Sequence, residues 1–136
     1  MLRAYLLGLA FAPVAVMVDK PVTIAVAAPE PVRHAKTVLL RIEGVVARRD
    51  VPWLWNVFWD LPEADAQTSV ENIHFVGYVA LPANSALRDP RPANFNMQLP
   101  EAAVAAMRRQ NTLRFTFVPL RKPPPGGVTI TLLRLE

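Results

Sequence analysis

Residues 53–61 read Trp-Leu-Trp-Asn-Val-Phe-Trp-Asp-Leu and contain all three tryptophans of the chain. Apolar residues recur at every second position from Trp55 to Leu61, which is typical of a strand with one buried face. Phe58 has the opposite parity, so this strand carries large rings on both faces. Such rings either all pack in a core or, on one face, form a contact surface for a partner. The sequence leaves both interpretations open.

The same alternation recurs along the rest of the chain and predicts further strands at 38–44, 73–81, 94–99, 112–117 and 128–133. Within the second of these ranges, Ile73, Phe75, Val79 and Leu81 are expected to share one face. Near Leu132–Leu133 the parity shifts, which predicts a bulge or a strand that is apolar on both faces. Turns rich in proline and glycine separate the strands. The pattern predicts an all-β fold, an antiparallel, jelly-roll-like β-sandwich of about six to eight strands.

One segment, residues 100–110, predicts a short helix instead. Pro100 suits the first turn of a helix, and Glu101 suits its positive end. Val104 and Met107 are three positions apart and are expected to face the core.

The first 36 residues are predicted to be a segment separate from the sandwich domain at 37–136. A short basic head and an apolar run as far as Val18 are typical of a signal peptide. The alternative is a pair of additional strands, at 14–18 and 22–26. Both interpretations stay open, and the protein is expected to be periplasmic or secreted if residues 1–28 act as a signal peptide.

Charge and residue usage exclude several kinds of site. The net charge is +4, but the basic residues are scattered, so no nucleic-acid surface is predicted. The chain has no cysteine and two histidines, His34 and His74, which are too few for a structural zinc or dinuclear copper site. His74 is opposite in parity to Ile73 and Phe75 and is expected to face solvent or an interface. No catalytic residue, metal ligand or membrane span is predicted.

Several short motifs follow one another along residues 37–136. They are 38–44 (Val-Leu-Leu-Arg-Ile-Glu-Gly), 54–63 (Leu-Trp-Asn-Val-Phe-Trp-Asp-Leu-Pro-Glu), 75–78 (Phe-Val-Gly-Tyr), 117–119 (Phe-Val-Pro) and 126–130 (Gly-Gly-Val-Thr-Ile). Together they resemble the C-terminal accessory domain of tyrosinases and polyphenol oxidases, whose signature is Lys-Phe-Asp-Val. The chain departs from that signature at Leu54 and Asn56, and from the family's histidine- and lysine-rich loop at the proline-rich residues 82–92.

The resemblance implies a β-sandwich that packs over the entrance to the active site of a tyrosinase-like dinuclear copper oxidase and keeps it latent. The oxidase domain or subunit would be the partner and would hold the copper, since this chain has no copper-ligand set and needs no cofactor of its own. The resemblance further implies a placeholder side chain near the substrate position, and assistance in folding or copper loading. The apolar placeholder candidates are Leu81, Leu87 and Phe95. The candidate interface residues are Trp53, Trp55, Phe58, Trp59 and Tyr78.

Two other classes of function stay open at this point. A generic β-sandwich module would use the tryptophan strand to contact a protein or a carbohydrate. An enzyme with a site of an unrecognised type is the third class, although no catalytic motif supports it.

Overall fold

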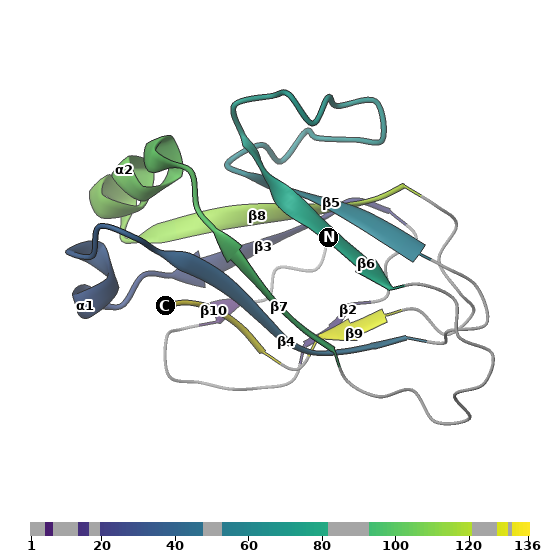
Figure 1. Ribbon diagram of the computed structural model, residues 1–136, viewed down its shortest axis with the longest axis horizontal. Coiled ribbons are helices and arrows are strands. Elements are labelled where there is room, and N and C mark those ends of the chain that lie inside the picture. The colour runs from purple at the N-terminus through teal and green to yellow at the C-terminus, as the bar shows by residue number, and fades with distance from the viewer. Residues whose placement is uncertain are drawn as a thin grey trace.

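The structure is a computed structural model that describes residues 5–6, 14–16, 20–47, 53–81, 93–120, 128–130 and 132–136. Its strands form two sheets that enclose a common core (Figure 1). Among the described strands, β1 and β3 pair in parallel and all other pairs are antiparallel. The predicted fold class, an all-β antiparallel sandwich, is confirmed.

The first sheet has β8 at its centre and β6 at one edge. Its strands lie in the order β1 (Tyr5–Leu6), β3 (Val22–Ala27), β8 (Thr112–Pro119), β5 (Trp53–Trp59) and β6 (Phe75–Leu81). The tryptophan strand is β5, and it is paired on both sides, by β8 and by β6. β5 is therefore an inner strand of this sheet, and side chains on either of its faces can be buried.

The second sheet is built around β4 (Leu39–Ala47). One side of β4 pairs with β7 (Ala93–Gln98), and the other pairs with β10 (Leu132–Leu135) and β9 (Val128–Ile130), beyond which lies β2 (Val14–Val16). β9 and β10 keep one register along β4, so the parity change near Leu132–Leu133 does not reflect a bulge against β4. A register shift occurs instead between β4 and β7, at Gly44, whose φ of 67° favours glycine.

The main core fills the space between the two sheets. Full burial of a large apolar side chain contributes about 1.5–3 kcal/mol, so a core of this size accounts for most of the stabilisation of the fold. The first sheet contributes Ile24, Val26, Trp55, Phe115 and Phe117, and the second contributes Leu40, Ile42, Met97, Leu133 and Leu135.

The predicted helix is confirmed as α2 (Glu101–Gln110). Val104 and Met107 are buried in the main core, as their spacing predicted. The helix ends at Asn111, which adopts a left-handed conformation (φ 61°) and donates its N–H to the carbonyl of Met107 at 2.9 Å. Asparagine is one of the few residues that takes this conformation readily.

A second helix, α1 (Glu30–Arg33), was not predicted, and prolines stand at positions 29 and 31. Proline is also compatible with the first turn of a helix, where no backbone donor is required. Arg108 of α2 joins the two helices: its Nε donates to the carbonyl of Arg33 (3.0 Å) and its Nη2 to that of Ala35 (2.7 Å).

The structure has strands in the N-terminal segment where it describes that segment. β2 and β3 correspond to the predicted strands at 14–18 and 22–26, and β3 pairs with β8 from Val22 to Ala27. Ile24 and Val26 are each 1% exposed. Residues 22–27 are therefore part of the folded sandwich, while a signal-peptide role for residues 1–28 stays a prediction.

Candidate interaction surface

Among the described side chains of the tryptophan strand, the aromatic rings of Trp55, Phe58 and Trp59 are buried. Trp55 is 1% exposed and Trp59 6% exposed, and both pack between the sheets. The indole of Trp55 meets the ring of Phe117 edge-on, with centroids 5.6 Å apart. The prediction that Trp55 and Trp59 form an interface is wrong. The backbone of Trp53 pairs with that of Leu81, and their side chains lie outside the described part of the structure.

Phe58 points to the opposite face of β5, yet it is also fully buried. It forms a second, smaller core with Ala64 and Val118, against which Leu61 and Phe75 pack. The rings of Phe58 and Phe75 lie edge to face, with centroids 5.6 Å apart. The loop that follows β5 thus covers this outer face, which corrects the interface prediction for Phe58.

The placement of Phe75 corrects the predicted parity of β6. The pairing of β5 with β6 shifts register between Val57 and Phe58, so that Val57 opposes Gly77 while Phe58 opposes Phe75. A bulge of this kind inserts one residue and reverses the side-chain pattern beyond it. As a result Phe75 packs in the small outer core, whereas Val79, which was expected on the same face, packs in the main core.

The loop from Asp60 to His74 is closed at its base by contacts between Trp59 and the end of the loop. The backbone N–H of Trp59 donates to the carbonyl of His74 (2.8 Å), and its indole Nε1 donates to the carbonyl of Ile73 (3.1 Å). The Nδ1 of His74 lies 2.7 Å from the carbonyl oxygen of Trp59, and the two rings are 4.4 Å apart. His74, which was expected to face solvent or an interface, is half-buried, and its ring lies against that of Trp59.

Side chains inside the loop fix its turns. The carboxylate of Asp65 accepts from the N–H of Gln67 (2.8 Å), and the hydroxyl of Ser69 accepts from the N–H of Glu71 (3.0 Å). The side-chain oxygen of Asn72 accepts from the N–H of His74 at 2.8 Å. Local bonds of this kind replace the strand ladder for a backbone that would otherwise be unpaired. The loop therefore has a defined conformation, and it also covers the outer face of β5.

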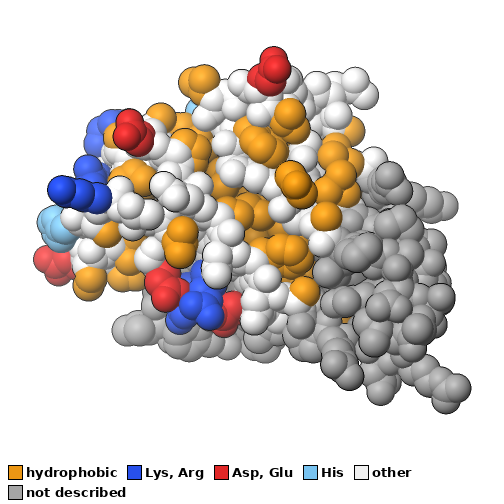
Figure 2. Space-filling view, viewed as in Figure 1, with side chains coloured by type: hydrophobic (Ala, Val, Ile, Leu, Met, Phe, Trp, Pro, Cys, Tyr) orange, Lys and Arg blue, Asp and Glu red, His pale blue; other side chains and the backbone are white. Residues whose placement is uncertain are grey.

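Three large apolar side chains are exposed among the residues that the structure describes. Val70 is 53% exposed, Ile73 75% and Tyr78 63%. The first two belong to the loop and the third to β6, which follows it directly. Figure 2 shows hydrophobic side chains gathered over β6 and the loop, with no Lys or Arg among them. The exposure of Tyr78 fits its predicted place in an interface, and that role stays a prediction.

The placeholder candidates lie largely outside the described structure. Leu87 and the side chain of Leu81 are not among the described atoms. Phe95, on β7, opposes Ile42 of β4 and is partly buried against the main core. Its placement favours a role in packing, and the placeholder role of Leu81 and Leu87 stays a prediction.

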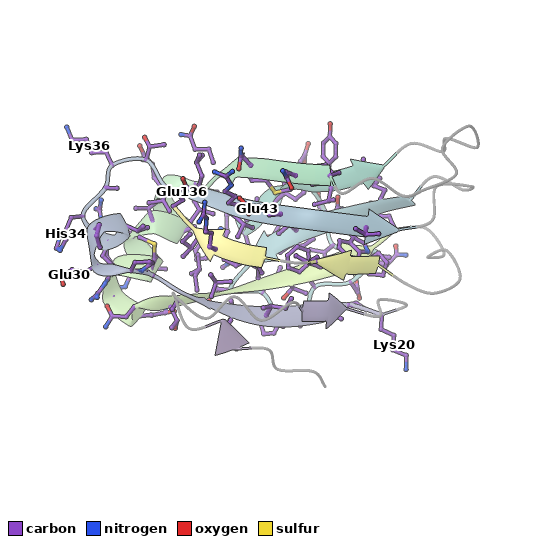
Figure 3. All side chains as sticks on the ribbon, turned by 90° about the horizontal axis from the view of Figure 1, so that it is seen from below. Lys20, Glu30, His34, Lys36, Glu43 and Glu136 are labelled. Carbon is purple, nitrogen blue, oxygen red and sulfur yellow. The ribbon has the colours of Figure 1, made fainter. Side chains whose placement is uncertain are left out.

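The outer face of the second sheet is polar, and its charged side chains form ion pairs with one another. Arg41 pairs with Glu43 and with Glu136, the latter at 3.2 Å, and Arg134 pairs with the same two carboxylates at 3.7 and 3.0 Å. Figure 3 shows Glu43 and Glu136 side by side on this face. Exposed pairs contribute about 0–1 kcal/mol each, so this network indicates a solvated face rather than a site.

No group of three or more His, Cys, Asp or Glu side chains that could hold a metal ion occurs among the described residues. His34 lies after α1, at the end of the molecule that the helices occupy (Figure 3), while His74 lies at the base of the loop before β6. The two histidines of the chain therefore do not form one ligand set. None of the helices in the described ranges is long and apolar enough to cross a membrane.

No protein-family model matches the chain, and no curated protein matches it in sequence. Solved structures do match: latent aurone synthase, a polyphenol oxidase from a natural source, has a TM-score of 0.70 at 15% identity over 90% of this chain. Latent apple tyrosinase has a TM-score of 0.68 at 19% identity over 91% of this chain. The chain has the fold of one part of the latent polyphenol oxidases.

The polyphenol oxidase resemblance predicted from the motifs is thus confirmed at the level of the fold. The matched region is 25% of the aurone synthase chain and 27% of the apple tyrosinase chain, which is consistent with the C-terminal domain of such enzymes. The chain therefore spans about a quarter of these neighbours. At this identity the likeness establishes shape, and the activity of the longer proteins does not transfer with it.

Sequence reasoning missed the loop at 60–74 as the feature that shapes this face. The alternation placed Ile73 on one strand face together with Phe75, Val79 and Leu81. One signal was present: Leu61, Ala64, Val70 and Ile73 are apolar residues within an otherwise polar segment. Which of these four side chains are buried and which are exposed depends on the path of the loop. The spacing of apolar residues in the sequence does not define that path.

Proposed function

We propose that this chain is a non-catalytic domain or subunit that packs over the active site of a tyrosinase-like dinuclear copper oxidase and keeps it latent. The observation that carries the proposal is the shared fold over 90% of the chain with a latent polyphenol oxidase, of which the chain corresponds to 25%. In this proposal the chain acts by contact, through a surface that excludes substrate from a neighbouring site.

The proposal includes two finer roles. The segment between Leu81 and Phe95 supplies the side chain that occupies the substrate position, with Leu81 or Leu87 as the apolar group. Contact with the oxidase also assists its folding or copper loading, because covering an open copper site protects it until the enzyme is mature. Both roles are supported by the resemblance of the motifs, and neither requires a metal in this chain.

The carbohydrate-binding alternative loses its main support. It relied on the tryptophan strand as an exposed platform, and Trp55 and Trp59 are buried in the main core. A stacking surface for a sugar needs exposed ring faces, and Tyr78 alone supplies one among the described residues.

The direct test is to mix the chain with the tyrosinase-type oxidase domain of the same organism. Binding with a large fall in the rate of catechol oxidation supports the proposal. Restoration of the rate when the chain is digested by a protease supports it further. An oxidase that neither binds the chain nor changes its rate contradicts the proposal.

A further inference from the structure

The most exposed apolar side chains in the described part of the molecule lie close in sequence and in two consecutive elements. Val70 and Ile73 belong to the loop 60–74, and Tyr78 belongs to β6. We call these three residues the loop–β6 patch. Large exposed hydrophobic side chains that gather on one face mark a contact site more often than isolated ones do.

The patch is held by a loop whose conformation is set before any partner binds. Trp59 closes the base of the loop through bonds to Ile73 and His74. Asp65 and Ser69 fix the turns between, by accepting backbone N–H bonds at 2.8 and 3.0 Å. A preorganised loop loses little conformational entropy on binding, so its apolar side chains can contribute most of their burial to affinity.

The segment that carries the patch is opposite in charge to the chain as a whole. Residues 60–81 contain four carboxylates and no lysine or arginine, although the chain carries a net charge of +4. Asp60 pairs with Arg114 at 3.5 Å. Glu63, Asp65 and Glu71 are exposed, and no ion pair involves them within the described ranges. The segment that carries the apolar patch is therefore acidic.

We propose that the loop–β6 patch is the surface through which this chain docks on the oxidase, and that the matching oxidase surface has an apolar centre and a basic rim. The inference rests on the proposed function. It adds which face of this chain contacts the oxidase and which chemistry the oxidase surface has. Apolar anchors supply affinity, and complementary charge at the rim accelerates association.

A second copy of this chain is a poorer occupant of the same surface. A two-fold dimer brings identical patches together, so the exposed carboxylates of one loop would face those of the other. Like charges placed across an interface oppose association. The oxidase is also the part of the similar latent enzymes that this chain does not cover, since it spans 25% and 27% of their length.

The test measures binding of the full chain to the tyrosinase-type oxidase domain of the same organism, with catechol oxidation as a second readout. Ile73→Ser and Tyr78→Ser are each expected to weaken binding about tenfold or more, because exposed anchors at an interface centre carry such effects. Glu71→Gln is expected to slow association and to reduce its dependence on salt. Since these side chains are exposed, thermal unfolding should stay unchanged.

Matched controls are Ala102→Ser and Glu101→Gln, on the exposed side of α2, which should bind as the unmodified chain does. If the unmodified chain inhibits the oxidase and the Ile73→Ser, Tyr78→Ser and Glu71→Gln variants all inhibit equally well, the docking assignment is wrong and the proposed function stands. If the unmodified chain does not bind the oxidase, both are wrong. A homodimer that Ile73→Ser dissociates would also overturn the assignment.

Discussion

Gly77 on β6 and Met97 on β7 are in contact across the two sheets: a Cβ at Gly77 would lie 3.2 Å from the Sδ of Met97. Met97 is buried in the main core, so little room exists for a side chain at position 77. A side chain at position 77 would therefore require Met97 to move by a few tenths of an ångström, at the point where an edge of the first sheet approaches an edge of the second.

Gly77→Val should lower the free energy of unfolding by about 1–3 kcal/mol through overpacking against Met97. Met97→Ala alone should cost about 2–5 kcal/mol by leaving a cavity. The double variant should be more stable than the sum of the two effects predicts, because valine fills the space that methionine leaves. Urea unfolding of all four proteins measures this coupling, and strictly additive effects would contradict the contact.

His74→Ala should destabilise the protein by about 1–2 kcal/mol, since the carbonyl of Trp59 loses its side-chain partner. Hydrogen exchange at the base of the loop should become faster in the same variant. His74→Asn is the matched comparison, because an amide nitrogen can replace Nδ1 in that bond without the ring. If His74→Ala unfolds at the same urea concentration as the unmodified chain, the closure of the loop does not depend on His74.

Asn111→Ala should cost about 1–2 kcal/mol, because alanine is disfavoured in the left-handed conformation that Asn111 adopts. Asn111→Gly should cost less, since it removes only the exposed bond that the side chain accepts from Arg33 at 2.9 Å. Thermal unfolding compares the two variants. Equal destabilisation by glycine and alanine would indicate that the side-chain bond, and not the backbone conformation, is the important feature.

Ile24→Ala should destabilise the protein by about 2–5 kcal/mol, because Ile24 on β3 is buried in the main core. Lys20→Ala is the control, since Lys20 is exposed. Unfolding of protein purified from the native host is the informative measurement. If Ile24→Ala has no effect there, residues 22–27 are not part of the mature fold, and the signal-peptide interpretation gains support.

The strands and the helix α2 were predictable because each follows a simple period. Alternation at Trp55, Val57 and Trp59 and the spacing of Val104 and Met107 depend only on local geometry. Those signals located the main core correctly. The outer face of β5 was not predictable in this way, because Phe58 is buried by contacts with Ala64 of the following loop and with Val118 of β8, which no local period indicates.

The remaining differences have specific physical causes. The register shift between Val57 and Phe58 moved Phe75 to the outer face, and a period-two pattern has no means of indicating one inserted residue. The ring of His74 turned back onto Trp59, where a backbone carbonyl accepts its bond. The exposure of Val70 and Ile73 was missed because apolar residues are expected inside, and only the path of the loop places them outside.

The central claim is that this chain docks on a tyrosinase-type oxidase and closes access to its copper site. Catechol oxidation by the oxidase domain of the same organism, titrated with the purified chain, tests it most directly. The account predicts a saturable loss of activity that Ile73→Ser weakens and Glu101→Gln leaves unchanged. Full activity at every concentration of the chain, with no complex detected, would contradict it.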